Sequence, residues 1–134
     1  MKVFISHAGA DETFVRKVVA GLEEAGFEAW DASREILPGD NWAAKIARAL
    51  QESEAMVVLL SPNALRSSAV RREIDYALGE QRYSNRLIPV LPKELNEEEI
   101  PWILRRLQMI QLGGDAKEEE GIHQIAQALL EAAA

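Results

Sequence analysis

Hydrophobic residues follow two alternating patterns along the chain. Short apolar runs predict strands at residues 3–5, 27–30, 55–60, 87–91 and 109–112. Between them, apolar residues recur every three or four positions and predict helices at residues 11–25, 42–50, 67–78, 96–107 and 122–130. The run at 55–60 is apolar throughout, which is typical of a central parallel strand buried on both faces. Pro89 is expected to interrupt the fourth strand.

This alternation of strands and helices at short intervals predicts right-handed crossovers and a parallel sheet. We expect an α/β fold, a flavodoxin-like three-layer sandwich whose five-stranded parallel sheet has the order 2-1-3-4-5 with helices on both faces. Because no internal repeat or linker is visible, residues 1–134 are expected to form one domain. Ligands of such folds bind beyond the carboxyl ends of the strands, from which residues 6–8, 31–39 and 61–68 should project.

Residues that begin or end helices and strands support these boundaries. Asp11 stands where a helix N-cap is expected, and Gly26 stands where a left-handed residue would close the same helix. Ser61-Pro62-Asn63 is expected to end the third strand, and residues 31–40 form a predicted loop that carries Pro38-Gly39. The strand ends therefore carry polar loops on one edge of the sheet.

The composition is that of a soluble globular domain, with 48% hydrophobic and 28% charged residues. The chain has no cysteine, which excludes disulfides, a thiolate nucleophile and a thiolate zinc site. Its only histidines are His7 and His123, which are far apart in the sequence, so no histidine-rich metal site is expected, and we predict no metal and no cofactor.

Net charge and apolar-run lengths bear on partners and compartment. The formal net charge of -7 disfavours nucleic acid and anionic membrane surfaces as partners. No apolar run approaches the roughly 20 residues that span a bilayer. A strand predicted from Val3 leaves no room for a signal peptide before it, so a cytoplasmic location is expected.

Glu73 is the most informative candidate for chemistry. Its helix is predicted to start near Ser67 or Ser68, which puts Glu73 in the second turn, near the carboxyl edge of the sheet. The apolar stripe of this helix is centred between Val70 and Ile74, and at about 100° per residue Glu73 falls on its border. A half-buried carboxylate at this edge is a candidate catalytic group.

The charged neighbours of Glu73 do not neutralise it locally. Arg71 and Arg72 can pair with Asp75 at helical spacing, whereas the residues three and four positions from Glu73 are Ala69, Val70, Tyr76 and Ala77. The structural alternative is a border glutamate that pairs with a distant arginine, and position alone favours this alternative.

His7 and Trp42 are the next candidates. His7 follows the first strand and could serve as a general base, although a hydrogen-bonding or stacking role is the more frequent one. Trp42 opens the second long helix and could wall a ring-shaped ligand, with core packing as the alternative. Trp30 and Trp102 are expected to be structural.

Several motifs of other enzymes with α/β folds are absent. The chain has neither the glycine-rich dinucleotide fingerprint nor a P-loop, and it lacks the serine nucleophile elbow. Response regulators share the predicted fold and carry an aspartate at the end of the central strand. Here that strand ends in Leu59-Leu60-Ser61-Pro62, which disfavours phosphoacceptor chemistry.

The order of motifs resembles the bacterial branch of Toll/interleukin-1 receptor (TIR) domains over essentially the whole chain. Val3-Phe4-Ile5-Ser6-His7 resembles the opening box of the family, and Ala29-Trp30-Asp31 with Glu35 to Trp42 resembles its second strand and the following BB loop. Ser61-Pro62-Asn63 and then Ser68 to Ile74 resemble the stretch that holds the catalytic glutamate. One departure is Ala69, where the family often has tryptophan four residues before its glutamate.

This resemblance implies an NAD glycohydrolase or cyclase, with NAD as substrate and no separate cofactor. It implies that the enzyme is a bacterial antiphage effector, activated by self-assembly, that depletes NAD or makes a cyclic ADP-ribose. The implied roles are catalysis by Glu73, substrate binding by Ser6, His7, Ala8, Arg34 and Trp42, and assembly through the BB-loop residues Ile36, Leu37, Pro38 and Gly39.

Two alternatives remain open: a TIR interaction and signalling module without turnover, and a virulence factor that mimics host TIR domains. Glu73 favours an enzyme, whereas Ala69 favours the interaction module. The expected partners are NAD, further copies of the chain, and a sensor domain or a partner protein. Because the resemblance begins at the first residue, a sensor domain is expected after Ala134.

Overall fold

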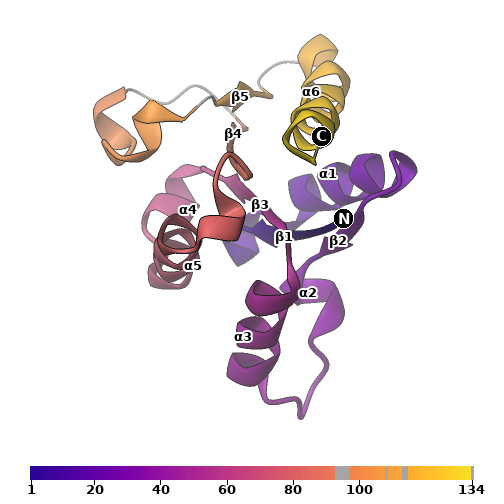
Figure 1. Ribbon diagram of the computed structural model, residues 1–134, viewed down its shortest axis with the longest axis vertical. Helices are drawn as coiled ribbons and strands as arrows, with labels where there is room; N and C mark the ends of the chain where they lie inside the picture. Colours follow the sequence, from indigo (N-terminus) through magenta and orange to yellow (C-terminus); the bar gives the residue numbers. More distant parts are fainter. Residues whose placement is uncertain (93–96, 108, 113–114, 134) are drawn as a thin grey trace.

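Five parallel strands form one sheet in the order β2-β1-β3-β4-β5 (Figure 1). The computed structural model describes residues 1–92, 97–107, 109–112 and 115–133. The strands are β1 (Lys2–Ser6), β2 (Glu28–Trp30), β3 (Ala55–Leu59), β4 (Leu87–Leu91) and β5 (Ile110–Gln111). The predicted fold class and strand order are thus confirmed.

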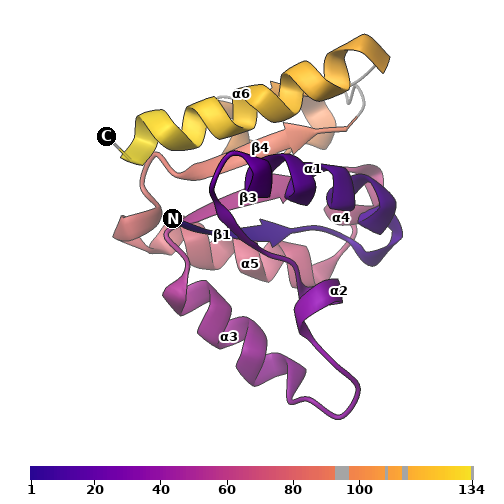
Figure 2. The same ribbon diagram turned by 90° about the vertical axis from the view of Figure 1, so that its right-hand side faces the viewer.

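Helices cover both faces of the sheet (Figures 1 and 2). α1 (Glu12–Glu24) and α6 (Asp115–Ala133) pack on one face, and α3 (Trp42–Glu52) and α5 (Ser68–Gly79) pack on the other. Alternate residues of β3 serve the two cores, with Val57 directed to the first and Val58 to the second. Both residues are at most 1% exposed, as expected for a central parallel strand.

The ends of α1 and α5 agree with the predicted capping residues, with one exception. Ser67 caps α5, since its Oγ accepts a hydrogen bond from the backbone N–H of Val70 at 3.2 Å. Gly26 has φ of 94°, which is the left-handed conformation that glycine tolerates best. Asp11 occupies the N-cap position of α1 without capping it, because its carboxylate accepts a hydrogen bond from Ser61 Oγ instead.

Two short helices were not predicted. α2 (Ala32–Glu35) lies within the segment expected to be a loop, and Asp31 caps it by accepting from the N–H of Ser33 at 3.1 Å. α4 (Pro62–Leu65) follows β3 directly, capped by Ser61 with proline in its first turn. The Ser61-Pro62-Asn63 sequence therefore ends a strand and also begins a helix.

The last third of the chain differs most from expectation. The helix predicted at 96–107 is replaced by two single 3₁₀ turns, Glu97–Glu99 and Leu104–Arg106, and Asn96 lies outside the described residues, as does Ala134. α6 is longer than the predicted 122–130, and β5 is shorter than 109–112. Pro89 does not interrupt β4. Proline has no N–H to donate, but among the described residues β4 pairs with β5 only from Val90 onward, so no strand hydrogen bond is lost there.

The three tryptophans divide into one packed and two exposed side chains. Trp30 stacks on Phe4 with ring centroids 5.2 Å apart, as its structural role predicted. Trp102 is 67% exposed, so the expectation of a structural role was wrong. Trp42 is 61% exposed, which rules out the core-packing alternative. It lies at the end of α3 that points away from the sheet (Figure 2).

α3 has few contacts with the rest of the domain. Only Ala49 and Leu50, near its end, are buried, although apolar residues mark its whole inner stripe. Ile46 in the second turn is partly buried against the core, whereas the first turn of this amphipathic helix is exposed. Among the described helices, none combines the length and the apolar character that crossing a membrane would require.

Candidate active site

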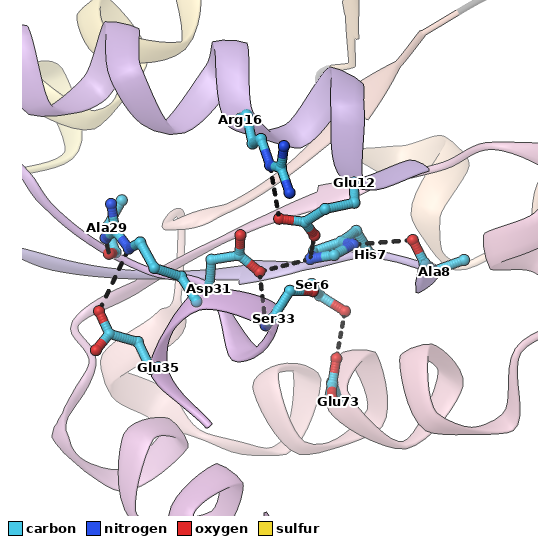
Figure 3. Close-up of polar contacts among 11 residues, drawn as sticks. Ser6, His7, Ala8, Glu12, Arg16, Ala29, Asp31, Ser33, Glu35 and Glu73 are labelled. Atoms are coloured by element: carbon cyan, nitrogen blue, oxygen red, sulfur yellow. Dashed lines mark hydrogen bonds and ion pairs between the residues drawn. The ribbon is translucent and has the colours of Figure 1, made fainter. Parts of the chain in front are cut away.

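Ser6 and Glu73 meet at the carboxyl edge of the sheet (Figure 3). Ser6 is the last residue of β1 and is fully buried, and Glu73 lies in the second turn of α5 and is half-buried. The Ser6 hydroxyl donates a hydrogen bond to Glu73 Oε1 at 2.6 Å. The oxygen Oε2 forms no hydrogen bond within the described residues and is not enclosed. One carboxylate oxygen is therefore held in place while the other faces outward.

Burial raises the pKa of the Glu73 carboxyl above its usual value. The hydrogen bond from Ser6 and the nearby charge of His7 act in the opposite direction, and burial prevails. Within the described residues, no lysine or arginine forms an ion pair with Glu73, so the alternative of a glutamate paired with a distant arginine is wrong there. In that part of the chain Arg71 and Arg72 also form no ion pair with Asp75, contrary to expectation.

His7 lies beside Ser6, enclosed by acceptors. Its Nε2 lies 2.8 Å from Asp31 Oδ1 and 3.3 Å from Glu12 Oε2, and its Nδ1 lies 2.9 Å from the backbone carbonyl of Ala8 (Figure 3). Both nitrogens face oxygen acceptors, an arrangement that favours the doubly protonated ring, which can donate on both sides. Burial by itself lowers the pKa of His7, but the bonds to Asp31 and Ala8 outweigh it and the pKa is raised.

This environment gives His7 a hydrogen-bonding role, because an imidazolium has no lone pair with which to act as a general base. The residues that hold it, Asp31 and Glu12, received no role from the sequence. A signal was present for Asp31, which directly follows β2 and therefore ends beside β1. Glu12 gave no such signal, since it lies in the first turn of α1 like many surface glutamates.

The remaining predicted residues lie apart from the Ser6–Glu73 pair. Arg34 donates to Glu23 Oε1 at 3.0 Å and to the carbonyl of Ala29 at 2.6 Å, which holds its guanidinium against α1 and β2. Trp42 lies at the exposed start of α3. The structure thus brings together Ser6, His7, Ala8 and Glu73 but leaves Arg34 and Trp42 elsewhere.

The loop at residues 36–41 is a defined turn. The N–H of Asp40 bonds the carbonyl of Leu37 at 3.0 Å, and Gly39 between them has φ of 89°. Proline at the second position and a left-handed glycine at the third are the requirements of a type II turn. Asp40 Oδ2 also accepts from the N–H of Leu37 at 2.8 Å. Leu37 is 61% exposed at the tip, whereas Ile36 is half-buried.

Five clefts of the described structure are lined by residues other than Ser6 and Glu73. One of about 500 Å³ lies on the opposite side of α5, between that helix and residues 98–105. Leu65, Ile74 and Trp102 contribute to its walls. The Ser6–Glu73 pair and this cleft are therefore separate places on the molecule.

Comparison with known proteins shows which sequences this chain resembles. A sequence model described as TIR domain matches residues 3–126. The chain is 26% identical over 131 residues to the 2' cyclic ADP-D-ribose synthase AbTIR of Acinetobacter baumannii, covering 96% of this chain and 49% of that protein. It is 30% identical over 99 residues to the NAD(+) hydrolase TcpC of Escherichia coli O6:H1, covering 72% of this chain and 32% of that protein.

A solved structure agrees with the sequence matches. The metazoan TIR-STING receptor from C. gigas in complex with 2',3'-cGAMP superposes with a TM-score of 0.79 at 29% identity, over 95% of this chain and 38% of that one. The chain thus spans between a third and a half of the length of these relatives.

Proposed function

The chain belongs to the TIR domain family, and on this premise we propose that it cleaves the bond between nicotinamide and ribose in NAD, with Glu73 as the catalytic carboxylate. Relatives named as an NAD(+) hydrolase and as a cyclic ADP-ribose synthase support this class of reaction. The observation that carries the proposal is the half-buried Glu73, held by Ser6 at 2.6 Å and unpaired with any cation of the described residues.

The chemistry needs little more than this carboxylate. The C1'–N bond breaks with its electron pair going to the ring, so a cationic pyridinium leaves as neutral nicotinamide and no acid is needed. The ribose left behind has the character of an oxocarbenium ion, which a carboxylate stabilises electrostatically while it hydrogen-bonds the ribose hydroxyls. Water then attacks C1' and loses a proton, giving ADP-ribose; attack by a hydroxyl or ring nitrogen of the same molecule gives a cyclic product instead.

The surroundings of Glu73 suit this role. Partial burial reduces solvent screening, so its negative charge acts more strongly on the reacting sugar than it would in water. The Ser6 hydrogen bond fixes Oε1, which leaves Oε2 to face the substrate. The charge of His7, fixed by Asp31 and Glu12, helps to keep Glu73 ionised although burial raises the pKa of Glu73.

We also propose that a second copy of the chain completes the site. Neither Ser6 nor Glu73 lines any of the five clefts described above. Two pairs of large apolar side chains are exposed in the described chain: Leu37 with Trp42, and Trp102 with Ile103. The loop before α3 with the start of that helix, and the stretch just before the 3₁₀ turn Leu104–Arg106, carry these residues and lie far apart (Figures 1 and 2). Contact between unlike surfaces of successive copies gives an open chain rather than a closed pair. In this account, assembly places the loop at 36–41 and α3 beside the substrate.

The biological role that fits this enzyme is an antiphage effector that removes NAD or makes a cyclic signal. The second candidate is a TIR interaction module without turnover. Ala69, which is exposed at the position where the family often has tryptophan, is the observation that favours it. Assembly without nicotinamide release would select this second candidate.

The test compares the wild-type protein with Glu73→Gln, which keeps an oxygen for Ser6 to bond but removes the charge. Each is incubated with NAD over a series of protein concentrations, and free nicotinamide is measured by chromatography. We expect release by the wild type, rising more steeply than in proportion to protein concentration, and none above background by the variant. The matched control is Glu80→Gln at the end of α5, which should leave the release unchanged.

A further inference from the structure

We propose that His7, Glu12 and Asp31 form a binding site for one zinc ion beside the Ser6–Glu73 pair. The sequence-based expectation of no metal considered only histidine-rich and thiolate sites, whereas this group combines one imidazole with two carboxylates. The three residues come from the end of β1, the first turn of α1 and the end of β2, so the fold brings them together (Figure 3). The proposal goes beyond NAD cleavage and does not depend on it.

The distances between the ligand atoms suit a metal ion. His7 Nε2 lies 2.8 Å from Asp31 Oδ1 and 3.3 Å from Glu12 Oε2, and all three atoms lie within 4.8 Å of one another. A zinc ion about 2.0–2.2 Å from each nitrogen or oxygen ligand keeps those ligands roughly 3–3.5 Å apart. The ion can therefore take its place after small movements of the side chains.

The hydrogen bonds around the group are those of a supported metal site. His7 Nδ1 faces the carbonyl of Ala8 at 2.9 Å, which directs Nε2 toward the carboxylates. Histidine ligands of zinc commonly donate their other ring N–H to a backbone carbonyl in this way. The N–H of Ser33 donates to Asp31 Oδ1 at 3.1 Å and fixes the rotamer of that carboxylate.

An unsatisfied carboxylate oxygen of Glu12 also supports a metal ion at this place. Its Oε2 is buried and accepts no hydrogen bond, although it points at His7 Nε2. A buried carboxylate oxygen without a donor is costly, and a metal ion satisfies it. The other oxygen, Oε1, faces Arg16 Nε at 3.8 Å, so Glu12 keeps its orientation when Oε2 binds the ion.

An ion can also reach the site. A cleft of about 330 Å³ is lined by Glu12 and Asp31, together with Glu23, Ser33 and Arg34. Two arginines also line it, Arg16 at 3.8 Å from Glu12 and Arg34 at 3.0 Å from Glu23, so each of their charges is partly neutralised by a glutamate. Binding replaces the proton on His7 Nε2 by the ion, and the proton goes to solvent. The dication then balances the two carboxylates, and mixed imidazole and carboxylate ligands favour zinc over magnesium or calcium.

The test titrates ZnCl₂ into the untagged full chain by isothermal titration calorimetry, with Glu12→Gln as the variant. Glu12→Gln removes one ligand but leaves the His7–Asp31 pair, and Glu24→Gln on the exposed side of α1 is the matched control. We expect one ion per chain, with affinity reduced more than about tenfold in Glu12→Gln and unchanged in Glu24→Gln. Equal binding by all three proteins would mean an adventitious ion only, and absence of binding would overturn the site.

A second measurement keeps the inference testable if Glu12→Gln does not fold. The chain has two histidines, so the ring ¹⁵N and ¹H signals of His7 and His123 can be told apart by one His123→Gln spectrum. Zinc should shift the Nε2 signal of His7 and leave His123 unchanged. A shift of His123 alone, or of neither ring, contradicts the proposal. Neither readout involves NAD, so failure here and failure of the proposed reaction are distinguishable.

Discussion

The carboxyl edge of β1 and the start of α3 are opposite kinds of surface. At the edge, Ser6 and His7 are enclosed and their side-chain polar atoms have defined partners, so the position of Glu73 Oε1 is set before any ligand arrives. At the start of α3, Trp42 and Leu37 are exposed and apolar, and nothing in the described chain covers them.

The proposed cleavage of NAD has two requirements, a catalytic carboxylate and a surface that encloses the substrate, and these two regions differ in which one they supply. In the proposed reaction, the catalytic carboxylate is built within one chain, and the surface that encloses the substrate comes from a second copy. A half-buried carboxylate without a finished cleft fits an enzyme that is inactive when alone and active when assembled. The following changes test each side of the comparison separately, beginning with the largest expected effect.

Asp31→Asn should weaken the edge. The His7 and Asp31 side chains are 5% and 3% exposed, so the variant loses a buried, charge-assisted hydrogen bond. We expect the free energy of unfolding to fall by roughly 1.5–3 kcal/mol, measured by urea denaturation in buffer with chelator. Asp75→Asn on the exposed face of α5 is the control and should change it by less than about 0.5 kcal/mol. Equal losses in both variants would contradict a special role for the pair.

Trp42→Glu should separate assembly from folding. The substitution places a charge in the exposed apolar surface without opening a cavity, so the melting temperature should stay within a degree or two of the wild type. Nicotinamide release at high protein concentration should fall by about tenfold, comparable to the loss of a central interface residue. Light scattering should show smaller assemblies. Full release with unchanged assembly size would remove α3 from the interface.

Ser6→Ala should change the acid side of the pH profile. In the proposed reaction the ionised form of Glu73 is the active one, so release should fall as the pH drops through the raised pKa of Glu73. The Ser6 hydrogen bond lowers the pKa of Glu73, so its removal should raise this pKa and move the fall in release to higher pH. We also expect the plateau rate to drop by about five- to tenfold. A profile that keeps its position would show that Ser6 does not act on Glu73.

Gly39→Ala should have the smallest effect. The φ of 89° at Gly39 disfavours any side chain, and we expect a loss of roughly 1 kcal/mol in the free energy of unfolding. Gly9→Ala is the matched control, since its φ is not positive and an added Cβ meets nothing within 4 Å. Thermal denaturation of both variants checks this, and equal stability of the two would contradict a fixed turn at Gly39.

Much of the fold could be predicted because local patterns and core packing agree. The apolar run at 55–60 became the central strand, and Ser67 caps the helix that carries Glu73. The border position of Glu73 on that helix also follows from periodicity alone, and its half-buried state agrees with it. The Ser6–Glu73 contact joins residues 67 positions apart, yet parallel topology already placed both at one edge.

Other features depend on tertiary context that the sequence pattern does not contain. Amphipathic spacing predicted the helix α3, but spacing alone does not show that its first residue, Trp42, is exposed. The grouping of Glu12 with His7 depends on how α1 starts after β1, which no spacing rule gives. Trp102 was misjudged because it lies in an exposed turn just before the 3₁₀ turn at Leu104–Arg106, which nothing in its local sequence indicates.

Nicotinamide release from NAD by the wild type and by Glu73→Gln, both at the concentration where the wild type assembles, is the most direct measurement of the central claim. The account predicts steady release by the wild type and a rate lower by about 10²-fold or more in the variant, with equal assembly and equal melting temperature. Equal rates in the two proteins would contradict a catalytic role for this carboxylate.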